Sequence, residues 1–372
     1  MANQFVVTPW EVSGEIDYDL LIEKFGTKRI DEELLDRLAS YGELHPMLRR
    51  SIVYSHRDLE WILDLYDKGE EFYLYTGRGP SGHTHLGHLM PWMFTKYLQD
   101  TFGAKLYFQL TDDEKFLFSE SLTFDDTNTH ALENALDVMA LGFDPEKTRF
   151  IQDTIHIRRL YPLALKVAKK VTFSTAKAVF GFDNSTNIGS IFYTSIQAAP
   201  AFLGSELAGR NVPCLIPCGI DQDPHFRVAR DVANSLGYYK PSLIHNKMFP
   251  GLLGNDKMSS SIPESTIYTT DSAKQVKKKI DNAFTGGRVS AEEQRKLGGN
   301  PDVCAVFKYQ FFVFEEEDEV LTDLYNQCTG GGILCGECKK RLTQKINAFL
   351  ENHQAKREEA RAHIKDLWLR DE

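Results

Sequence analysis

The chain alternates between short apolar runs, which are typical of buried strands, and longer stretches whose apolar residues recur at helical spacing. A run at 71–76 predicts a strand, glycine and proline at 77–80 end it, and apolar residues from Leu89 onward predict a helix. A second strand is expected at 213–217, followed by a turn at 218–224 and a helix from His225. Parallel strands joined by helices place a ligand crevice at their carboxyl ends, so we expect these two turns to converge.

The turn after the 71–76 strand has the chemistry of an anion site. Exposed backbone N–H groups of a glycine-rich turn and the positive end of the following helix attract a phosphate. His85 and His88 are three residues apart, so on a first helical turn both imidazoles project the same way, and Gly87 between them leaves room for close approach. Taken alone, the segment also fits an ordinary strand-to-helix turn with surface histidines, or a metal site that includes His83, although no zinc spacing follows.

A second motif, Lys257-Met-Ser-Ser-Ser261, follows a glycine-rich segment at 251–256. A lysine on a loop that can move is suited to meet charge that develops on a triphosphate during reaction. Taken alone, residues 257–261 are typical of a solvated loop. Together, and in this order, the two motifs resemble the HIGH and KMSKS signatures of the class I aminoacyl-tRNA synthetases.

Further segments narrow the resemblance to the tryptophanyl-tRNA synthetases of the eukaryotic cytoplasmic and archaeal branch. The match runs from about residue 7 to residue 361 and rests on the segments Tyr75-Thr-Gly-Arg-Gly-Pro-Ser81, Gln109-Leu-Thr-Asp-Asp-Glu-Lys115, Ile196-Gln-Ala-Ala-Pro200 and Ile220-Asp-Gln-Asp-Pro224. Two positions depart from the class signatures: Leu86 is the second residue of the first motif, and Ser260 stands where the second motif has its second lysine. Lys257 is therefore expected to be the main phosphate cation of its loop.

The resemblance implies an enzyme that activates L-tryptophan with ATP and transfers it to the 3′ end of tRNA(Trp), with Mg²⁺ held chiefly by the triphosphate and no metal site in the protein. The residues it implies for catalysis are His85, His88, Lys257, Ser259, Ser261 and Arg78. Those implied for ATP are Thr76, Gly77, Gly79, Gly87, Lys115, Gly219, Ile220, Asp221 and Met258. Those implied for tryptophan are Tyr75, Gln109, Glu114, Gln197 and Gln222, with Phe226 as a pocket wall or plain core.

From the resemblance we expect this chain to form a Rossmann-like α/β catalytic domain with a parallel sheet at 71–271. A helical insertion at about 125–190 is expected to interrupt this domain and to form a homodimer interface. Residues 1–70 are expected to hold a short hairpin over the active site and helices at 31–38 and 56–66, and residues 272–372 to form an all-α domain that binds the tRNA anticodon. The helical tail is expected from Thr343, with apolar residues at Ile346, Phe349, Leu350, Ile364, Leu367 and Trp368.

Composition changes this picture in three places. No run of about 18 apolar residues exists, and the first residues resemble neither a secretory nor an organellar leader, which favours a cytoplasmic protein without a membrane span.

The net charge of −10 argues against a nucleic-acid partner. However, residues 339–372 contain nine Lys or Arg against six acids, and these residues and the basic run at 274–279 provide candidate contacts to tRNA phosphates. Cys335 and Cys338 have metal spacing, with Cys328 and Cys304 as possible further ligands, although structural thiols are the simpler interpretation.

Three alternatives are weighed against the tryptophan enzyme. A tyrosyl-tRNA synthetase shares the architecture, but its pocket normally supplies an acid for the phenol. A small-molecule nucleotidylyltransferase would lack the Lys257 loop and the basic tail. A non-catalytic paralogue that binds tRNA or takes part in signalling is disfavoured by the intact His85, His88, Lys257, Gln109 and Glu114.

Overall fold

The computed structural model describes residues 6–7, 12–13, 16–254 and 257–370. Seven strands form one sheet in the order β3-β4-β9-β8-β5-β6-β7. The five strands from β9 to β7 run parallel, whereas β3 and β4 are antiparallel additions at one edge. The parallel strands are β5 (Tyr73–Arg78), β6 (Lys105–Leu110), β7 (Thr148–Gln152), β8 (Cys214–Gly219) and β9 (Ser242–Asn246).

The strand order reverses between β5 and β8. From β5 the chain adds β6 and β7 on one side, and it then returns to add β8 and β9 on the other. Such a switch point opens a crevice at the carboxyl ends of the two central strands, because the connections leave in opposite directions. The two turns expected to converge, after Arg78 and after Gly219, are therefore adjacent, and the Rossmann-like prediction is confirmed.

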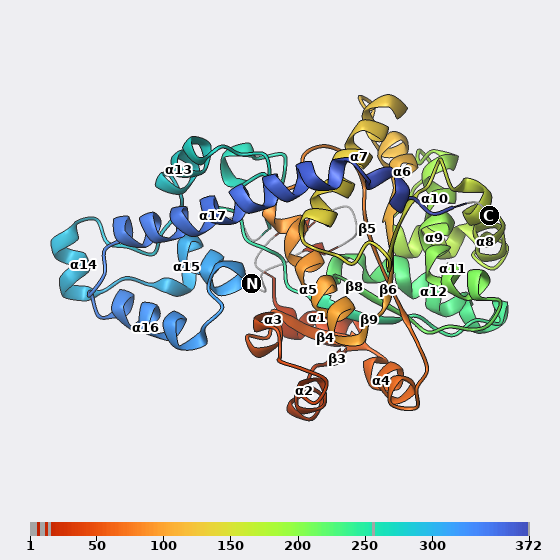
Figure 1. Ribbon diagram of the computed structural model, residues 1–372, viewed down its shortest axis with the longest axis horizontal. Helices are drawn as coiled ribbons and strands as arrows, with labels where there is room; N and C mark the ends of the chain where they lie inside the picture. Colours follow the sequence, from red (N-terminus) through yellow and green to blue (C-terminus); the bar gives the residue numbers. More distant parts are fainter. Residues whose placement is uncertain (1–5, 8–11, 14–15, 255–256, 371–372) are drawn as a thin grey trace.

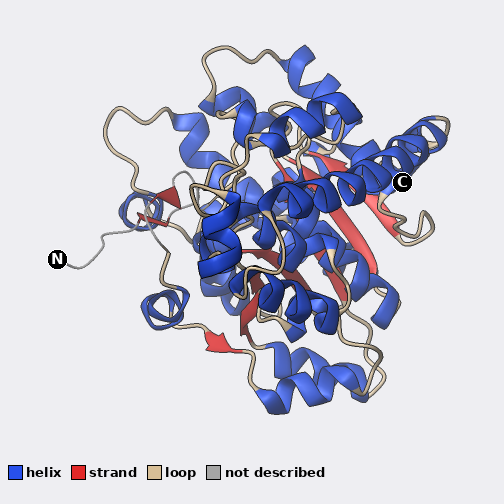
Figure 2. Ribbon diagram, turned by 90° about the vertical axis from the view of Figure 1, so that its left-hand side faces the viewer, coloured by secondary structure: helices blue, strands red, loops and turns tan. Residues whose placement is uncertain are grey.

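Helices cover both faces of the sheet (Figures 1 and 2). Alternate residues of a strand face opposite sides. Accordingly, Leu74 packs in a core with the helices α4, α5 and α7, whereas Tyr73 and Tyr75 pack with α8, α10, α11 and α12. The helices of this part are α4 (Leu59–Asp67), α5 (Leu86–Phe102), α6 (Asp112–Phe118), α7 (Phe124–Ala140), α8 (Ile157–Ala168), α9 (Phe173–Phe180), α10 (Ile188–Ala198), α11 (Pro200–Ala208) and α12 (Asp223–Leu236).

The amino-terminal part differs from the expected hairpin and helices. The short strands β1 (Val6–Val7) and β2 (Val12–Ser13) do pair antiparallel, and α2 (Glu32–Ala39) begins after the cap Asp31 as expected. However, the helix predicted at 56–66 was wrong at its start, because His56 lies in a strand of the main sheet. The elements before β5 are also α1 (Tyr18–Phe25), β3 (Lys28–Arg29), α3 (Pro46–Arg49) and β4 (Val53–Arg57).

The segment at 125–190 is largely helical, as predicted, but it also contains β7, which forms the edge of the sheet. This strand escaped the sequence analysis because Arg149 and Gln152 interrupt its short apolar run. Part of the expected insertion is thus integral to the α/β fold.

After β9 the described residues contain no further named strand, which confirms the all-α carboxyl-terminal part. The long helix α17 (Cys335–Arg361) begins in a distal lobe that α13, α14, α15 and α16 form around its first turns, and it then runs back along α7 (Figure 1). It begins eight residues before the predicted Thr343. The tail then reaches the sheet, where Leu369 N donates a hydrogen bond to Phe150 O. The elements of this part are α13 (Ala273–Asp281), α14 (Ala291–Leu297), α15 (Ala305–Tyr309), a π-helical turn (Gln310–Phe314), α16 (Asp318–Thr329) and α17 (Cys335–Arg361).

None of the helices among the described residues is long and apolar enough to cross a membrane.

Candidate active site

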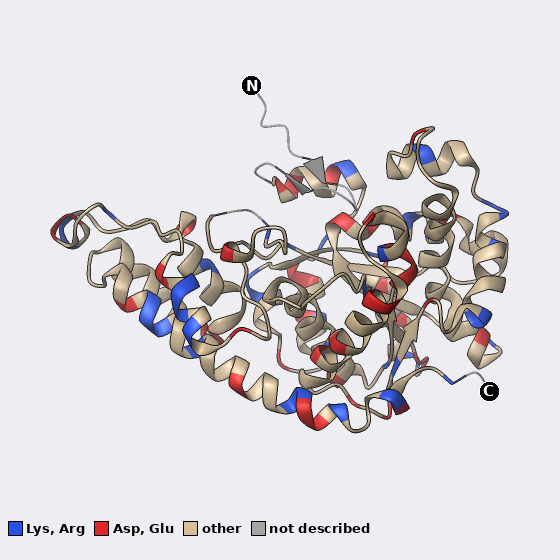
Figure 3. Ribbon diagram, turned by 90° about the horizontal axis from the view of Figure 1, so that it is seen from above, with Lys and Arg blue, Asp and Glu red and all other residues tan. Residues whose placement is uncertain are grey.

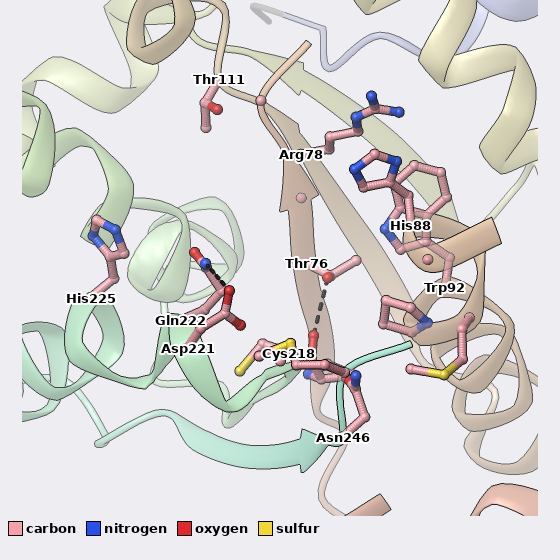
Figure 4. A pocket seen from close by; sticks show the side chains of 18 of the residues that line it. Thr76, Arg78, His88, Trp92, Thr111, Cys218, Asp221, Gln222, His225 and Asn246 are labelled. Atoms are coloured by element: carbon pink, nitrogen blue, oxygen red, sulfur yellow. Dashed lines mark hydrogen bonds between the residues drawn. The ribbon is translucent and has the colours of Figure 1, made fainter. Parts of the chain in front are cut away.

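A cavity of about 330 Å³ opens at the carboxyl ends of β5 and β8 (Figure 4). In this view Arg78 and His88 lie on one side of β5, and Asp221, Gln222 and His225 lie on the other. Most of the residues expected at the site line this cavity: Thr76, Gly77, Arg78, Gly79, His85, Gly87, His88, Glu114, Lys115, Gln197, Gly219, Asp221, Gln222, Phe226, Lys257 and Met258. Five expected residues do not: Tyr75, Gln109, Ile220, Ser259 and Ser261.

The two histidines begin α5. His85 is the amino-terminal cap, and its backbone N–H donates to Nδ1 of His88 over 3.2 Å, which fixes the orientation of the second ring. The rings stack with centroids 3.5 Å apart. A Cβ on Gly87 would lie 3.1 Å from Nδ1 of His85, so glycine makes room for this pair.

Both imidazoles are held neutral. Burial lowers the pKa of His85 and of His88 well below the ordinary 6.5, and the positive charges of Arg78 and Lys257 act in the same direction. Neutral rings can donate N–H hydrogen bonds to phosphate oxygens without carrying charge themselves. The positive charge at this end of the cavity therefore comes from Arg78 and Lys257.

Arg78 is buried and tied to the turn that precedes α5. Its guanidinium donates to Oγ1 of Thr84 over 2.7 Å and to the carbonyl oxygens of Gly82 and His83. Burial lowers its pKa to about 10, so it remains a cation at neutral pH. The contacts mean that Arg78 shapes the anion-binding turn as well as charging it.

Lys257 reaches across the cavity to a carboxylate. Its Nζ lies 3.1 Å from Oδ2 of Asp221, an atom that also accepts a hydrogen bond from Nε2 of Gln222. The lysine side chain is 41% exposed, whereas that of Asp221 is 7% exposed, so the lysine is the partner free to move. Asp221, expected to bind ribose, instead neutralises the lysine in this arrangement.

Three expected residues lie apart from the cavity for clear reasons. The hydroxyls of Ser259 and Ser261 are 2.9 Å apart and pair with each other. The side chain of Ile220 is fully buried in a small core with Leu21, Tyr54 and Met248. The side chain of Ile220 therefore does not face the cavity, where we expected it to contact adenine.

The glycines of the turn are required by neighbouring side chains and strands. A Cβ on Gly79 would come within 1.8 Å of Cε of Lys115, and one on Gly77 within 2.6 Å of the carbonyl oxygen of Gln109 in β6. The backbone of β6 thus explains Gly77, whereas a Cβ on Gly79 would meet the movable ends of Lys115 and Glu114.

A buried amide network closes the opposite end of the cavity. Oε1 of Gln109 accepts hydrogen bonds from the hydroxyl of Tyr75 and from Nε2 of Gln197, the latter over 3.0 Å. Nε2 of Gln109 donates to both carboxyl oxygens of Asp153, each over 2.9 Å. The hydroxyl of Tyr193 donates to Oε1 of Gln197. Tyr75 and Gln109 are fully buried, so they lie directly behind the cavity wall that Gln197, Tyr193 and Phe226 form.

Glu114 stands between the two ends. Its carboxylate accepts a hydrogen bond from Thr111 over 2.7 Å and pairs with Nζ of Lys115 over 2.6 Å. Phe226 packs edge-on against Tyr75, with ring centroids 5.6 Å apart, and also lines the cavity. Phe226 thus forms part of the cavity wall and part of the core at once.

The sequence analysis missed two members of the amide network, Asp153 and Tyr193. Asp153 follows β7, the strand that was not recognised, and had that strand been predicted, an acid at its carboxyl end would have stood out. Tyr193 lies in α10, one helical turn before Gln197, so its spacing from a predicted residue was an available signal.

No group of three or more His, Cys, Asp or Glu side chains in the described part of the chain is placed to hold a metal ion. The cavity is lined by imidazoles, cations and amides.

Comparison with known proteins identifies the class. Residues 67–351 match the family of class I tRNA synthetases for tryptophan and tyrosine, and the chain belongs to this family. Within it, the chain is 52% identical over 365 residues to a tryptophan–tRNA ligase of Pyrobaculum calidifontis, covering 98% of this chain and 97% of the relative. The crystal structure of tryptophanyl-tRNA synthetase from Plasmodium falciparum matches with a TM-score of 0.88 at 38% identity, covering 94% of this chain and 97% of that one. The enzyme from Giardia lamblia matches with a TM-score of 0.89 at 36% identity, covering 95% of this chain and 96% of that one. The chain is thus a member of the tryptophan–tRNA ligase family, and the tyrosine alternative is not favoured.

Proposed function

We propose that the protein activates L-tryptophan with ATP and transfers it to the 3′ end of tRNA(Trp). The observation that carries this proposal is the polarity of one cavity. Cations and neutral imidazoles gather at one end, and a buried amide network closes the other. We call these the phosphate end (Arg78, His85, His88 and Lys257) and the indole end (Tyr75, Gln109, Asp153, Tyr193 and Gln197).

At the phosphate end the reaction needs charge stabilisation and positioning. The tryptophan carboxylate attacks the α-phosphorus of ATP in line, the bond to the bridging oxygen breaks, and pyrophosphate leaves. His85 and His88 would donate hydrogen bonds to phosphate oxygens from the start of α5. Lys257 would exchange Asp221 for the leaving pyrophosphate, which Ser259 and Ser261 would join as the loop closes. Asp221, once released, is free to accept a hydrogen bond from the ribose.

The remaining nucleotide contacts follow from the cavity wall. Thr76, Gly77, Gly79 and Gly87 line the cavity from β5 to α5, and Gly219 and Met258 line it as well. A Cβ on Gly87 would lie 3.3 Å from Cβ of Met258, so these two residues face the same part of the nucleotide path, and Gly219 would approach adenine from the end of β8. Lys115, already paired with Glu114, lies beside this path and would face a phosphate. Magnesium would arrive with the triphosphate, because the phosphate end offers imidazoles and cations in place of the oxygen ligands that this ion prefers.

At the indole end an acceptor is needed for a single N–H on a large apolar body. Oε1 of Gln109 is the acceptor, and Tyr75 shares it. Binding of the indole N–H would displace Nε2 of Gln197, which frees that amide to meet the amino acid's carboxylate. Glu114 and Gln222 line the cavity nearby and would hold the ammonium and carboxylate groups.

Basic residues of the distal lobe support tRNA binding. Figure 3 shows Lys and Arg gathered on this lobe, where α13 and the first half of α17 carry Lys274, Lys278, Lys340 and Arg341 on exposed positions. The second half of α17 is different. Arg357 is buried and pairs with Glu133 and Asp137 of α7, and Arg361 also pairs with Glu133. We therefore restrict the phosphate-contact proposal to α13 and the start of α17.

A homodimer is supported by apolar side chains exposed around α8 and α9. Ile155, Tyr161, Phe173 and Ile188 are 53%, 48%, 48% and 84% exposed, respectively. An apolar surface of this kind suits a second subunit. We also place the enzyme in the cytoplasm, where tRNA charging serves translation.

Charging of tRNA tests the proposal most completely. Purified protein is incubated with ATP, magnesium, either labelled tryptophan or labelled tyrosine, and either a tRNA(Trp) transcript or a tRNA(Tyr) transcript, and the labelled tRNA is counted. The proposal predicts charging of tRNA(Trp) with tryptophan alone. Charging of tRNA(Tyr) with tyrosine, or of neither tRNA, would overturn it.

A further inference from the structure

The turn that anchors Arg78 is itself held by α7. Asn134 of this helix is fully buried, and its Nδ2 donates to the carbonyl oxygen of Gly82 over 3.1 Å and to Oγ1 of Thr84 over 3.3 Å. One helical turn further on, the carboxylate of Asp137 accepts a hydrogen bond from the hydroxyl of Thr84. The same hydroxyl oxygen accepts from Nη1 of Arg78 over 2.7 Å. Arg78, Thr84 and Asp137 therefore form one chain of contacts that leads away from the cavity.

Asp137 carries a negative charge in the interior of the protein. It is 1% exposed, and burial alone would raise its pKa. Hydrogen bonds from His353, Arg357 and Thr84 and the positive charge of Arg357 nevertheless bring this pKa below 3.8. The charge of Asp137 also acts on Arg78, where it opposes the lowering of the guanidinium pKa by burial. Asp137 thus supports the charge of Arg78 without itself lining the cavity.

The partners of Asp137 come from α17, the long helix that runs along α7 (Figure 1). Nε2 of His353 donates to Oδ1 of Asp137 over 2.9 Å, and Nη1 of Arg357 pairs with the same oxygen. The buried residues earlier on α17 are Leu342, Ile346 and Leu350. The buried stripe of the helix therefore turns polar where the helix reaches Asp137.

A second route joins α17 to the same turn. Nε2 of Gln354 donates to the carbonyl oxygens of Thr269 and Asp271, over 2.8 and 3.2 Å. The backbone N–H of Thr269 in turn donates to the carbonyl oxygen of Thr84 over 3.0 Å. The helix that begins in the distal lobe thus holds Thr84 through both its side chain and its backbone.

The orientation of Arg78 depends on this turn. Its Nη1 donates to Thr84, and its Nη2 donates to the carbonyl oxygens of Gly82 and His83. Its Nε is buried and has no hydrogen-bond partner among the described residues, which leaves this donor available to a phosphate oxygen. A shift of Thr84 would therefore move the guanidinium that lines the phosphate end.

Stability alone does not account for charges at this place. Apolar residues of similar volume often stabilise a protein as well as a buried ion pair does, because taking charges out of water is unfavourable. The apolar residues earlier on α17 show that this helix packs without charge elsewhere. An apolar pair in place of Asp137 and His353 would supply neither a negative charge near Arg78 nor an acceptor for Thr84.

We propose that Asp137, His353 and Arg357 are positioning residues of the phosphate end. They hold Thr84, and through it Arg78, in the orientation that meets the triphosphate. This inference rests on the proposed function, which assigns Arg78 to the phosphates of ATP. It gives the second half of α17 a part in amino-acid activation, distinct from the tRNA contacts proposed for its start.

Variants of α17 test this role in tryptophan-dependent exchange of pyrophosphate into ATP. His353→Leu removes the donor to Asp137, whereas His353→Gln keeps an N–H donor. Leu350→Ala, on the same buried stripe, is the matched control, because it weakens packing without removing a member of the cluster. We expect kcat to fall about 10–100-fold in His353→Leu, as for a lost hydrogen bond to a charged group, and by less than about threefold in the other two. The KM for tryptophan should stay within about twofold in all three.

Equal losses of kcat in His353→Leu and Leu350→Ala would show that the cluster serves packing only, and would overturn the proposal. A loss in His353→Gln as large as that in His353→Leu would do the same. Folding of each variant is checked by circular dichroism. If His353→Leu does not fold, Asp137→Asn, which keeps the shape of the carboxyl group and loses its charge, takes its place with the same expected loss.

Binding of ATP separates this proposal from the proposed function, because calorimetric titration with ATP and magnesium needs neither amino acid nor turnover. His353→Leu should weaken ATP binding about tenfold in the unmodified background and hardly at all in an Arg78→Ala background, where no guanidinium remains to be positioned. Additive losses would overturn the positioning role even if the unmodified protein exchanges with tryptophan. Non-additive losses in a protein that fails to exchange would support the positioning role and overturn the proposed function. An unmodified protein that does not bind ATP would overturn both.

Discussion

The two ends of the active-site cavity are held in opposite ways. At the indole end every key polar atom is tied to another buried group: Gln109 to Tyr75, Gln197 and Asp153 at once. At the phosphate end the main cation is exposed and paired only with Asp221. Under the proposed function the indole end would give up only the Gln197 contact of Gln109, whereas the phosphate end would exchange its Lys257–Asp221 pair for substrate.

This difference follows from the two tasks. Selecting one amino acid requires donors and acceptors that cannot relax to suit a wrong side chain, because discrimination comes from leaving a buried polar group unpaired. Transferring a nucleotide requires a charge that follows the reacting phosphates and then lets pyrophosphate leave. A firmly held indole end suits the selection of one amino acid, and a movable phosphate end suits the transfer of the nucleotide.

Loss of Lys257 should have the largest effect. Lys257→Ala removes the movable cation, and we expect pyrophosphate exchange to fall by about 10²–10³ in kcat, the usual cost of removing one charge-stabilising donor. Tryptophan affinity, measured by calorimetry without ATP, should stay within about twofold because the indole end is untouched. Strong loss of tryptophan binding in a folded variant would break the division between the two ends. Ser260→Ala, the matched control on the same loop, should cost far less, because the exposed side chain of Ser260 has no assigned contact with the substrate.

Loss of Gln109 should have the opposite effect to loss of Lys257: it should impair the use of tryptophan and leave the use of ATP nearly unchanged. Gln109→Ala removes the acceptor, so kcat/KM for tryptophan should fall by about 10–100-fold, as expected for about 1–3 kcal/mol of lost buried hydrogen bonding. The KM for ATP should change little. Discrimination between tryptophan and tyrosine, measured as the ratio of their kcat/KM values, should shrink. An unchanged ratio would remove Gln109 from the indole end.

Loss of Asp153 should impair the indole end less than loss of Gln109 does. Burial and the neighbouring Asp113 raise the pKa of Asp153 well above 3.8, which favours the neutral acid, and its carboxyl oxygens accept from Nε2 of Gln109. Asp153→Ala leaves Nε2 of Gln109 unpaired, and we expect about a tenfold loss of kcat/KM for tryptophan. Asp153→Asn keeps an acceptor of the same shape and should lose much less. Equal losses in the two variants would contradict the neutral form.

The histidines of the phosphate end predict a pH effect on stability. Their folded-state pKa values lie below the ordinary 6.5, so the unfolded chain binds protons that the folded chain refuses. The free energy of unfolding is therefore highest above pH 6.5 and falls as the pH drops below it, by up to about 1.4 kcal/mol per pH unit for each histidine. Chemical denaturation between pH 5 and 8 should show a shallower slope in His88→Gln than in the unmodified protein. Equal slopes would show that His88 titrates normally.

Local spacing made the phosphate end predictable from sequence. His85, Gly87 and His88 act within a single helical turn, and a strand, a glycine turn and a helix start determine where they point. The features that the sequence did not predict depend on contacts between residues far apart in the chain. The Lys257 to Asp221 pair joins two loops, and β4 joins the sheet only because β9 offers it an edge.

The tail of the chain shows a signal that sequence analysis could have used. The buried residues of α17, Leu342, Ile346, Leu350, His353 and Arg357, follow one another at helical spacing. Arg357 thus continues an apolar stripe, which indicates a buried ion pair, and Glu133 and Asp137 supply it. Net charge counted along the segment concealed this division between paired and exposed cations.

Amino-acid-dependent exchange of labelled pyrophosphate into ATP tests the central claim most directly. The purified protein is given magnesium, ATP and each of the twenty amino acids in turn. The account predicts exchange with tryptophan alone, because the phosphate end supplies the chemistry and the indole end supplies the choice. Exchange with tyrosine would keep the phosphate end but contradict the roles of Tyr75 and Gln109, and no exchange with any amino acid would contradict catalysis itself.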